Sequence, residues 1–245
     1  MTEAQNPHEI DTAMVLAAGY GKRMRPLSDT VPKPLIPVDG RPLIDRVLDR
    51  LVEAGVKRAI VNVHYLADQI EEHLKARSDI EISISDERRE VLDTGGGVKR
   101  ALPLIGEKPF LIVASDTAWI PGAKAAIPEM MARFDPDVMD MLLLVAAGTA
   151  SVGLSGVGDF DLDPLGRLSR RQPQKLAPFS YASVMITTPS FYADTPDGPF
   201  SNNLLFDRAI GNERLFGVRL DGIWMHIGTP EALKEAEDAL ADSIL

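Results

Sequence analysis

Apolar residues in the first half of the chain alternate between short solid runs and helically spaced positions. Residues 13–17 and 59–63 are compact apolar runs typical of buried strands, and between them the apolar residues of 43–52 recur at helical spacing. Further along, the pattern predicts a helix around 70–74, a half-buried edge strand over 80–85, a helix opening at 95–97 and a strand over 110–113. This repeat predicts parallel βαβ units in a Rossmann-like, doubly wound α/β fold, with a mostly parallel central sheet and helices on both faces.

The second half of the chain is less regular. Its pattern predicts strands over 140–147, 181–186 and 214–220, a polar hairpin over 157–170 and a helix over 202–210. Thr229, Pro230 and Glu231 are typical of a helix start, so a last helix is expected to run to about Ala241. Because no linker or repeat is visible, we expect residues 1–245 to form a single domain, with 1–11 as a flexible N-terminal segment.

Composition narrows the class of protein. The chain has 245 residues, of which 45% are hydrophobic and 25% charged, as in an ordinary globular protein. It has no cysteine, which excludes disulfides and thiolate metal sites, and its formal net charge of −10 argues against general binding to nucleic acids or anionic membranes. Residues 1–11 lack the basic start and apolar core of a signal peptide, and the long uncharged stretch 141–158 contains glycines, so we expect a cytoplasmic protein without a membrane span.

The segment after the first predicted strand concentrates positive charge. Gly19 and Gly21 follow that strand directly and allow the backbone to turn its N–H groups toward a phosphate. Residues 17–35 contain four basic side chains and one acidic one, and a cationic pocket in an acidic protein suits a polyanionic small molecule. The loop fits neither the Rossmann spacing, because Met24 occupies the third glycine position, nor a P-loop, because no Gly-Lys-Ser/Thr is present.

A longer motif over residues 16–35 is more informative than the two glycines alone. The pattern Leu16-Ala17-Ala18-Gly19-x-Gly21-x-Arg23-Met24-Arg25-Pro26-Leu27, followed by Pro32-Lys33-Pro34-Leu35, resembles the signature of sugar-1-phosphate nucleotidyltransferases. The resemblance covers nearly the whole chain and implies the nucleotidyltransferase version of the fold. It implies that Arg23 steadies the β- and γ-phosphates and that Lys33 contacts the attacking sugar phosphate, which makes these two the expected catalytic residues. The nucleotide-binding residues it implies in this loop are Leu16, Ala17, Ala18, Gly19, Gly21, Lys22, Arg23 and Met24.

Two later motifs fit the same series. Leu92-Asp93-Thr94-Gly95-Gly96-Gly97 resembles the family's second loop beside the nucleobase, which implies nucleotide contacts from Gly95 and Gly96, although the same residues also suit a plain helix start. Asp116, at the end of an apolar strand, is similar to the family's magnesium aspartate, although alone it would suit a cap or a turn. The implied cofactor is Mg²⁺, with Mn²⁺ as an alternative.

The chain departs from the family at the second metal position. In Trp224-Met225-His226-Ile227-Gly228-Thr229-Pro230, His226 stands where the family has a carboxylate, and imidazole is a poor ligand for Mg²⁺. Three alternatives follow. Asp116 holds Mg²⁺ with triphosphate oxygens and water; His226 favours Mn²⁺ or another transition ion; or the chain senses nucleotide sugars without turnover. The retained glycines, Arg23, Lys33 and Asp116 favour an enzyme.

The sequence says least about which sugar phosphate the chain binds. The resemblance implies sugar-phosphate contacts from Lys33, Lys175, Ser183 and Asn202, although a solvated loop or a helix cap explains the last three equally well. Residues 90–97 are most similar to N-acetylmuramate-1-phosphate uridylyltransferases of cell-wall recycling, with mannose-1-phosphate guanylyltransferases and glucose-1-phosphate nucleotidyltransferases as alternatives. The expected reaction therefore joins UTP and the muramic sugar phosphate, with these small molecules as the only expected partners and no indication of the oligomeric state.

Overall fold

The computed structural model describes residues 9–154 and 156–243, so most of the expected flexible segment 1–11 lies outside the described residues. The strands are β1 (Thr12–Leu16), β2 (Pro37–Val38), β3 (Arg41–Pro42), β4 (Arg58–Val63), β5 (Glu81–Asp86), β6 (Phe110–Ala114), β7 (Thr117–Pro121), β8 (Met141–Ala147), β9 (Ser151–Val152), β10 (Phe160–Leu162), β11 (Leu168–Arg170), β12 (Phe179–Thr187), β13 (Leu215–Arg219) and β14 (Gly222–His226). The α-helices are α1 (Leu43–Glu53), α2 (Ala67–Leu74), α3 (Asp93–Ile105), α4 (Ala126–Arg133), α5 (Asn203–Gly211) and α6 (Pro230–Asp242).

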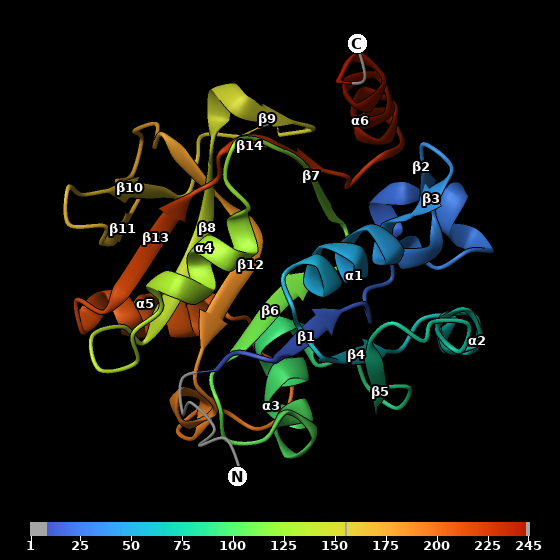
Figure 1. The fold of residues 1–245 in the computed structure, drawn as a ribbon, viewed down its shortest axis with the longest axis horizontal. Coiled ribbons are helices and arrows are strands. Elements are labelled where there is room, and N and C mark those ends of the chain that lie inside the picture. The colour runs from blue at the N-terminus through green and yellow to red at the C-terminus, as the bar shows by residue number, and fades with distance from the viewer. Residues whose placement is uncertain (1–8, 155, 244–245) are drawn as a thin grey trace, which may run out of the picture.

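A large central sheet organises the molecule (Figure 1). Its main path runs β11-β10-β12-β6-β1-β4-β5, and β8 joins it by pairing with β12 and β13. Strands β6, β1, β4 and β5 are mutually parallel, whereas β12 is antiparallel to both β6 and β8. The carboxyl ends of the parallel strands therefore meet at one edge, where open α/β sheets bind their ligands.

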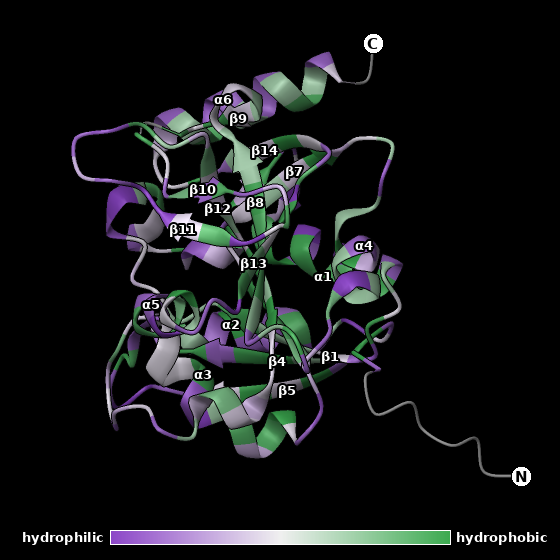
Figure 2. Ribbon diagram, turned by 90° about the vertical axis from the view of Figure 1, so that its left-hand side faces the viewer, coloured by the Kyte–Doolittle hydropathy of each residue, from purple (hydrophilic) through white to green (hydrophobic). Residues whose placement is uncertain are grey.

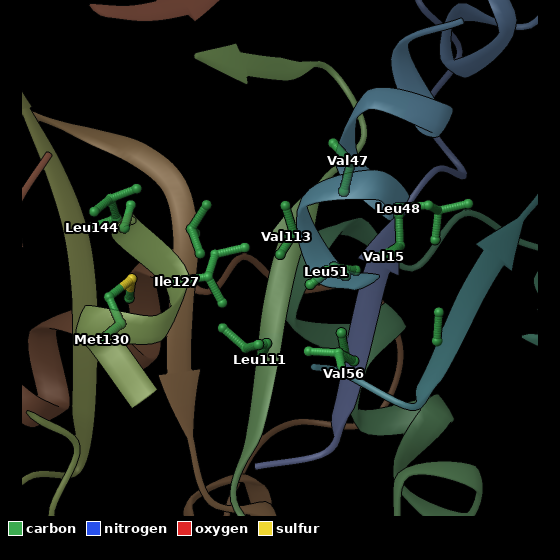
Figure 3. Close-up of a cluster of buried hydrophobic side chains, with 14 of the residues drawn as sticks. Val15, Val47, Leu48, Leu51, Val56, Leu111, Val113, Ile127, Met130 and Leu144 are labelled. Carbon is green, nitrogen blue, oxygen red and sulfur yellow. The ribbon is translucent and has the colours of Figure 1, made fainter. Parts of the chain in front are cut away.

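The strands at the centre are apolar on both faces, which explains the solid apolar runs in the sequence. In β1, Ala13 and Val15 join one buried cluster and Met14 joins the other. Helices α1 and α4 cover the first face, and α3 and α5 cover the second. Figure 3 shows Val15 and Val113 of the sheet close to the side chains of α1. In Figure 2 the strands β8 and β13 are mainly hydrophobic, whereas α6 alternates, as a helix with one solvated face should.

A smaller apolar cluster packs the peripheral elements against one another. It combines Met24 from the loop after β1 with Ile36, Ala118 of β7 and Met225 of β14, among others. Strand β14 pairs antiparallel with β7 and parallel with β9. Thr229 caps α6 as expected, because its hydroxyl accepts a hydrogen bond from the amide of Ala232. None of the helices in the described ranges is both long and apolar enough to cross a membrane.

The structure confirms the α/β fold class and most of the expected elements. The edge strand 80–85, the hairpin within 157–170 and the last helix are found as β5, β10–β11 and α6. Helix α3 begins two residues earlier than the glycines that were expected to open it. Helix α4 and the β7–β14 pair were not predicted from the sequence, because α4 has only eight residues and β7 follows β6 after a two-residue turn.

We expect Gly96→Ala to destabilise the protein by about 1–3 kcal/mol, the usual cost of overpacking a tight site. A Cβ at position 96 would lie 2.3 Å from the backbone oxygen of Gly198, so α3 would have to move away from that segment. Gly211→Ala is the matched control, since a Cβ there meets no heavy atom within 4 Å. Urea unfolding of the three proteins checks this, and equal stability of the two variants would contradict it.

Candidate functional site

A cavity of about 370 Å³ opens at the carboxyl ends of β1, β4 and β6. Its walls come from the loop after β1, the start of the 33–35 turn, the ends of β4 and β6, and the segment that leads into α3. The lining residues are Leu16, Ala17, Ala18, Gly19, Lys33, Pro34, Asn62, Glu87, Val91, Asp93, Thr94, Ala114, Ser115 and Asp116. The cavity therefore contains part of the expected nucleotide loop together with Lys33 and Asp116.

The loop after β1 is built to present its backbone. Within the described residues, the amide hydrogens of residues 18–21 have no acceptor, so they are available to a phosphate. Gly21 has φ +62°, and a Cβ there would lie 3.0 Å from Cβ of Lys33. Glycine is thus required both for the turn and for the approach of the lysine. Met24 is fully buried in the smaller cluster and anchors the end of the loop.

Three basic side chains of the loop are exposed, and one of them, Arg25, forms an ion pair with Asp29. Arg23 has no hydrogen-bond or ion-pair partner among the described residues. Its guanidinium lies close to Gly228, where an added Cβ would be 3.4 Å from the Arg23 Cζ. Lys22 instead places its ammonium 5.2 Å from the ring centre of Tyr20. An exposed arginine without a partner suits bidentate binding of phosphate oxygens.

Lys33 and Asp116 form an ion pair at the base of the cavity. The Nζ of Lys33 lies 2.6 Å from Oδ2 of Asp116, and the two side chains are 11% and 26% exposed. Burial by itself raises the pKa of Asp116, but the charge and hydrogen bond of Lys33 outweigh it, so this pKa lies below its ordinary value. The carboxylate is thus ionised at neutral pH and is held by a cation that is itself within reach of a ligand.

His226 stands next to this ion pair. Strand pairing places it opposite Thr117, the residue after Asp116, and the amide of Ile227 donates to the Asp116 carbonyl. Burial lowers the pKa of His226 below its ordinary value, although the charge of Asp116 opposes that shift. Among the described residues, its Nδ1 is the one buried side-chain nitrogen or oxygen that has no hydrogen-bond partner. His226 does not line the cavity itself, but a buried nitrogen without a partner beside the ion pair points to a group that binds together with the ligand.

Of the two side chains at the family's metal positions, Asp116 and His226, only one offers oxygen ligands for Mg²⁺. The described residues contain no cluster of three or more His, Asp or Glu side chains that could form a protein-only metal site. Mg²⁺, however, commonly uses one or two carboxylates together with substrate phosphates and water. Asp116 meets that requirement alone, whereas the imidazole of His226 does not match the oxygen preference of Mg²⁺.

A buried polar pair on the cavity wall was missed by the sequence reasoning. Asn62, at the end of β4, accepts a hydrogen bond from the amide of Ala17 and donates one to Glu87. Both side chains are nearly inaccessible, at 2% and 1% exposure. The available signal was a polar residue inside the apolar run of β4. His64, two residues further along, contacts the Glu87 carbonyl and the Tyr20 hydroxyl.

The nucleotide contacts expected of Gly95 and Gly96 stay a prediction, and the structure shows how the two residues pack within the protein. Their amide hydrogens both donate to the carbonyl of Phe200, at 2.8 and 3.1 Å, so a contact with the nucleotide would have to use other atoms of these residues. A Cβ at position 95 would lie 2.3 Å from the Phe200 ring, so glycine is needed there for helix packing. The cavity wall is formed instead by the two preceding residues, Asp93 and Thr94.

Of the residues expected to contact the sugar phosphate, Lys33 lines the cavity, whereas Lys175, Ser183 and Asn202 do not. Ser183 lies at an irregularity of β12, between Tyr181 and Met185, with a left-handed φ of +62°. Lys175 is exposed in a turn closed by its amide and the Gln172 carbonyl. The side-chain oxygen of Asn202 accepts the Tyr192 hydroxyl, which gives this buried side chain a structural partner.

Comparison with known proteins places the chain among nucleotidyltransferases. A protein-family model described as nucleotidyl transferase matches residues 12–151. The N-acetylmuramate alpha-1-phosphate uridylyltransferase of Caulobacter vibrioides is 46% identical over 94% of this chain and 97% of that protein. The protein of the same name from Neisseria meningitidis is 34% identical over 92% of this chain and 96% of its own length.

A solved structure agrees on the fold. The UDP-glucose pyrophosphorylase from Acinetobacter baumanii superposes with a TM-score of 0.76 at 18% identity, covering 94% of this chain and 92% of its own. Together with the family match and the two similar relatives, this agreement confirms the resemblance found in the motifs: the chain belongs to the nucleotidyl transferase family, among the sugar-1-phosphate nucleotidyltransferases.

Proposed function

We propose that this chain joins UTP and N-acetylmuramate α-1-phosphate to form the nucleotide sugar and pyrophosphate. The observation that carries the proposal is the Lys33–Asp116 ion pair beside a loop with free amides, within one cavity. The relatives from Caulobacter and Neisseria support the choice of base and sugar. Both substrates are small molecules, and the reaction suits a cytoplasmic enzyme whose single domain needs no nucleic acid or membrane.

The chemistry follows from the charges. An oxygen of the sugar phosphate forms a bond to the α-phosphorus of UTP, and the bond from that phosphorus to the pyrophosphate oxygen breaks. The attacking oxygen is already ionised, so no general base is required. Because both reactants are anions, the main barrier is their mutual repulsion, which fixed cations and alignment in one cavity reduce.

Each residue has a proposed task in this step. Lys33 neutralises the attacking phosphate, because its ammonium is buried and already held in place by Asp116. Arg23 binds the β- and γ-phosphates with its unpartnered guanidinium, and residues 18–21 donate their amides to the triphosphate. Asp116 would hold Mg²⁺ or Mn²⁺, which would neutralise further phosphate charge. Ser183 and Lys175 remain proposed contacts of the sugar.

A second candidate is a nucleotide-sugar sensor without turnover. The observation that favours it is His226 at the family's second carboxylate position, with a buried and unpartnered Nδ1. A sensor would bind a nucleotide sugar tightly with any metal and would release no pyrophosphate. A guanylyltransferase acting on mannose-1-phosphate is the alternative within the enzyme class.

A substrate panel tests the proposal directly. Purified protein with Mg²⁺ is assayed for pyrophosphate release with UTP, GTP, CTP and dTTP, each against the 1-phosphates of N-acetylmuramate, glucose and mannose. We expect UTP with the muramic sugar to give the highest kcat/KM. Best turnover with GTP and mannose-1-phosphate would assign the alternative enzyme, and tight binding without turnover under Mg²⁺ and Mn²⁺ would favour the sensor.

Lys33→Ala should lower kcat/KM by at least about 100-fold, comparable to the loss of one preorganised donor to a transition-state charge. The matched control is Lys108→Ala, since Lys108 pairs with Asp11 at the start of β1, at the opposite edge of the sheet. Steady-state kinetics with both substrates make the comparison, and circular dichroism verifies folding. A folded Lys33→Ala protein with activity near that of Lys108→Ala would refute the role.

His226→Asp should lower the Mg²⁺ concentration required for half-maximal velocity, because it adds a second carboxylate beside Asp116. We expect kcat to change by less than about tenfold, since Asp116 alone satisfies the commonest Mg²⁺ arrangement. His226→Asn, which adds no charge, is the control. Mg²⁺ titrations that coincide for the two variants would contradict the prediction, and a far larger gain in kcat would mean that the native site lacks a required ligand.

A further inference from the structure

Glu87 is a buried acid for which the proposed reaction has no use. It follows β5 directly, and its side chain is 1% exposed although it carries a carboxyl group. Burial raises the pKa of Glu87 above its ordinary value, and the hydrogen bonds it accepts oppose that shift only in part. Removing a carboxyl group from water is costly unless its oxygens are bonded, so its position calls for a physical reason.

Every polar group of Glu87 is engaged with a segment that borders the cavity. Oε1 accepts from the side chain of Asn62 at 2.7 Å, and Oε2 accepts from the amide of Leu92 at 3.2 Å. Its amide donates to the carbonyl of Val63, and its carbonyl lies 2.7 Å from Nδ1 of His64. Glu87 thus bonds both to the end of β4 and to the segment that leads into α3.

Asn62 continues the connection to the loop after β1. Its Oδ1 accepts the amide of Ala17 at 2.7 Å, and its Nδ2 donates to Glu87. A continuous path of three hydrogen bonds therefore runs from Ala17, through the two side chains, to Leu92. The two ends of this path lie in the loop after β1 and in the segment before α3, and both of these segments contribute residues to the cavity lining.

Gly97 provides the space for this pair. A Cβ at position 97 would lie 2.7 Å from Oε1 of Glu87 and 2.8 Å from Nδ2 of Asn62. The third glycine of the second loop therefore has a definite function, which is to let α3 pack directly against the pair. A side chain at that position would push the carboxylate and the amide apart.

We propose that Asn62 and Glu87 are positioning residues that set the spacing of the two loops and thereby the affinity for the nucleoside triphosphate. The inference rests on the proposed function. The oxygens of the pair are already bonded to the protein, so the pair acts through Ala17 and Leu92 rather than as a catalytic group. The part of the site proposed to bind the sugar phosphate, around Lys33 and Asp116, does not depend on the pair.

A reciprocal exchange of the two side chains tests the pair. Glu87→Gln turns an amide donor toward either Asn62 Nδ2 or the Leu92 amide, and Asn62→Asp places two carboxylates face to face. The double variant Asn62→Asp/Glu87→Gln restores all three hydrogen bonds. The new carboxylate at 62 can accept from Ala17 and from the amide at 87, and the remaining oxygen at 87 can accept from Leu92.

We expect each single substitution to raise both KM and the calorimetric Kd for UTP by about tenfold or more, the effect of one unsatisfied buried group. The KM for the sugar phosphate should change little, and the double variant should return to within about threefold of the original value. Thr187→Val is the matched control. It removes a buried hydrogen bond to Asp140 at the opposite edge of the sheet and should leave both KM values unchanged.

The outcomes separate this inference from the proposed function. A double variant that binds UTP no better than the poorer single one would overturn the pairing, and so would folded single variants with unchanged KM and Kd for UTP. A rise in the KM for the sugar phosphate equal to that for UTP would instead indicate a general structural role. If the original protein binds UTP without releasing pyrophosphate, the proposed enzyme fails while the calorimetric cycle still decides the pairing. Absence of binding to any nucleoside triphosphate overturns both.

Discussion

Strand β1 is buried on both faces and hydrogen-bonded on both sides, and the architecture of the site depends on that constraint. Its neighbours β6 and β4 are parallel to it, so the three strands deliver their following loops to one edge. The two apolar faces require helices above and below, and both are covered. Rigid strands beneath flexible loops allow charged groups to be held within hydrogen-bond distance of one another.

The basic residues at this edge of the sheet have the opposite sign to the net charge of the molecule. A chain with a net charge of −10 places Lys33 in its cavity, where the carboxylate of Asp116 pairs with it, and Arg23 lies near Gly228 in the segment after His226. The Lys33–Asp116 ion pair joins residues that are 83 positions apart in sequence. The small β7–β14 pair brings His226 to the same place, and the buried, unpartnered Nδ1 of that residue distinguishes this site from one with two carboxylates.

Glycine is required for different physical reasons in the loop after β1 and at the start of α3. Gly21 is required by a left-handed backbone angle and by the approach of Lys33. Gly95 and Gly96 are required because α3 packs against the segment around Phe200 with no room for a side chain, and Gly97 is required because Glu87 and Asn62 lie against it. A glycine-rich motif after a strand therefore indicates a close approach, while the partner in that approach is a matter of tertiary structure.

The sequence by itself determined the fold class, the order of most elements, the family and the residues of the first loop, because these depend on periodicity and on motifs that are local along the chain. The apolar runs of β1 and β6 and the cap at Thr229 are examples. Only the tertiary structure decided that Lys33 binds Asp116, that Asn202 bonds to Tyr192, and that Glu87 and Asn62 join the two loops. Those contacts link residues that are between 10 and 83 positions apart, so they are set by the packing of the sheet and helices and leave no periodic trace in the sequence.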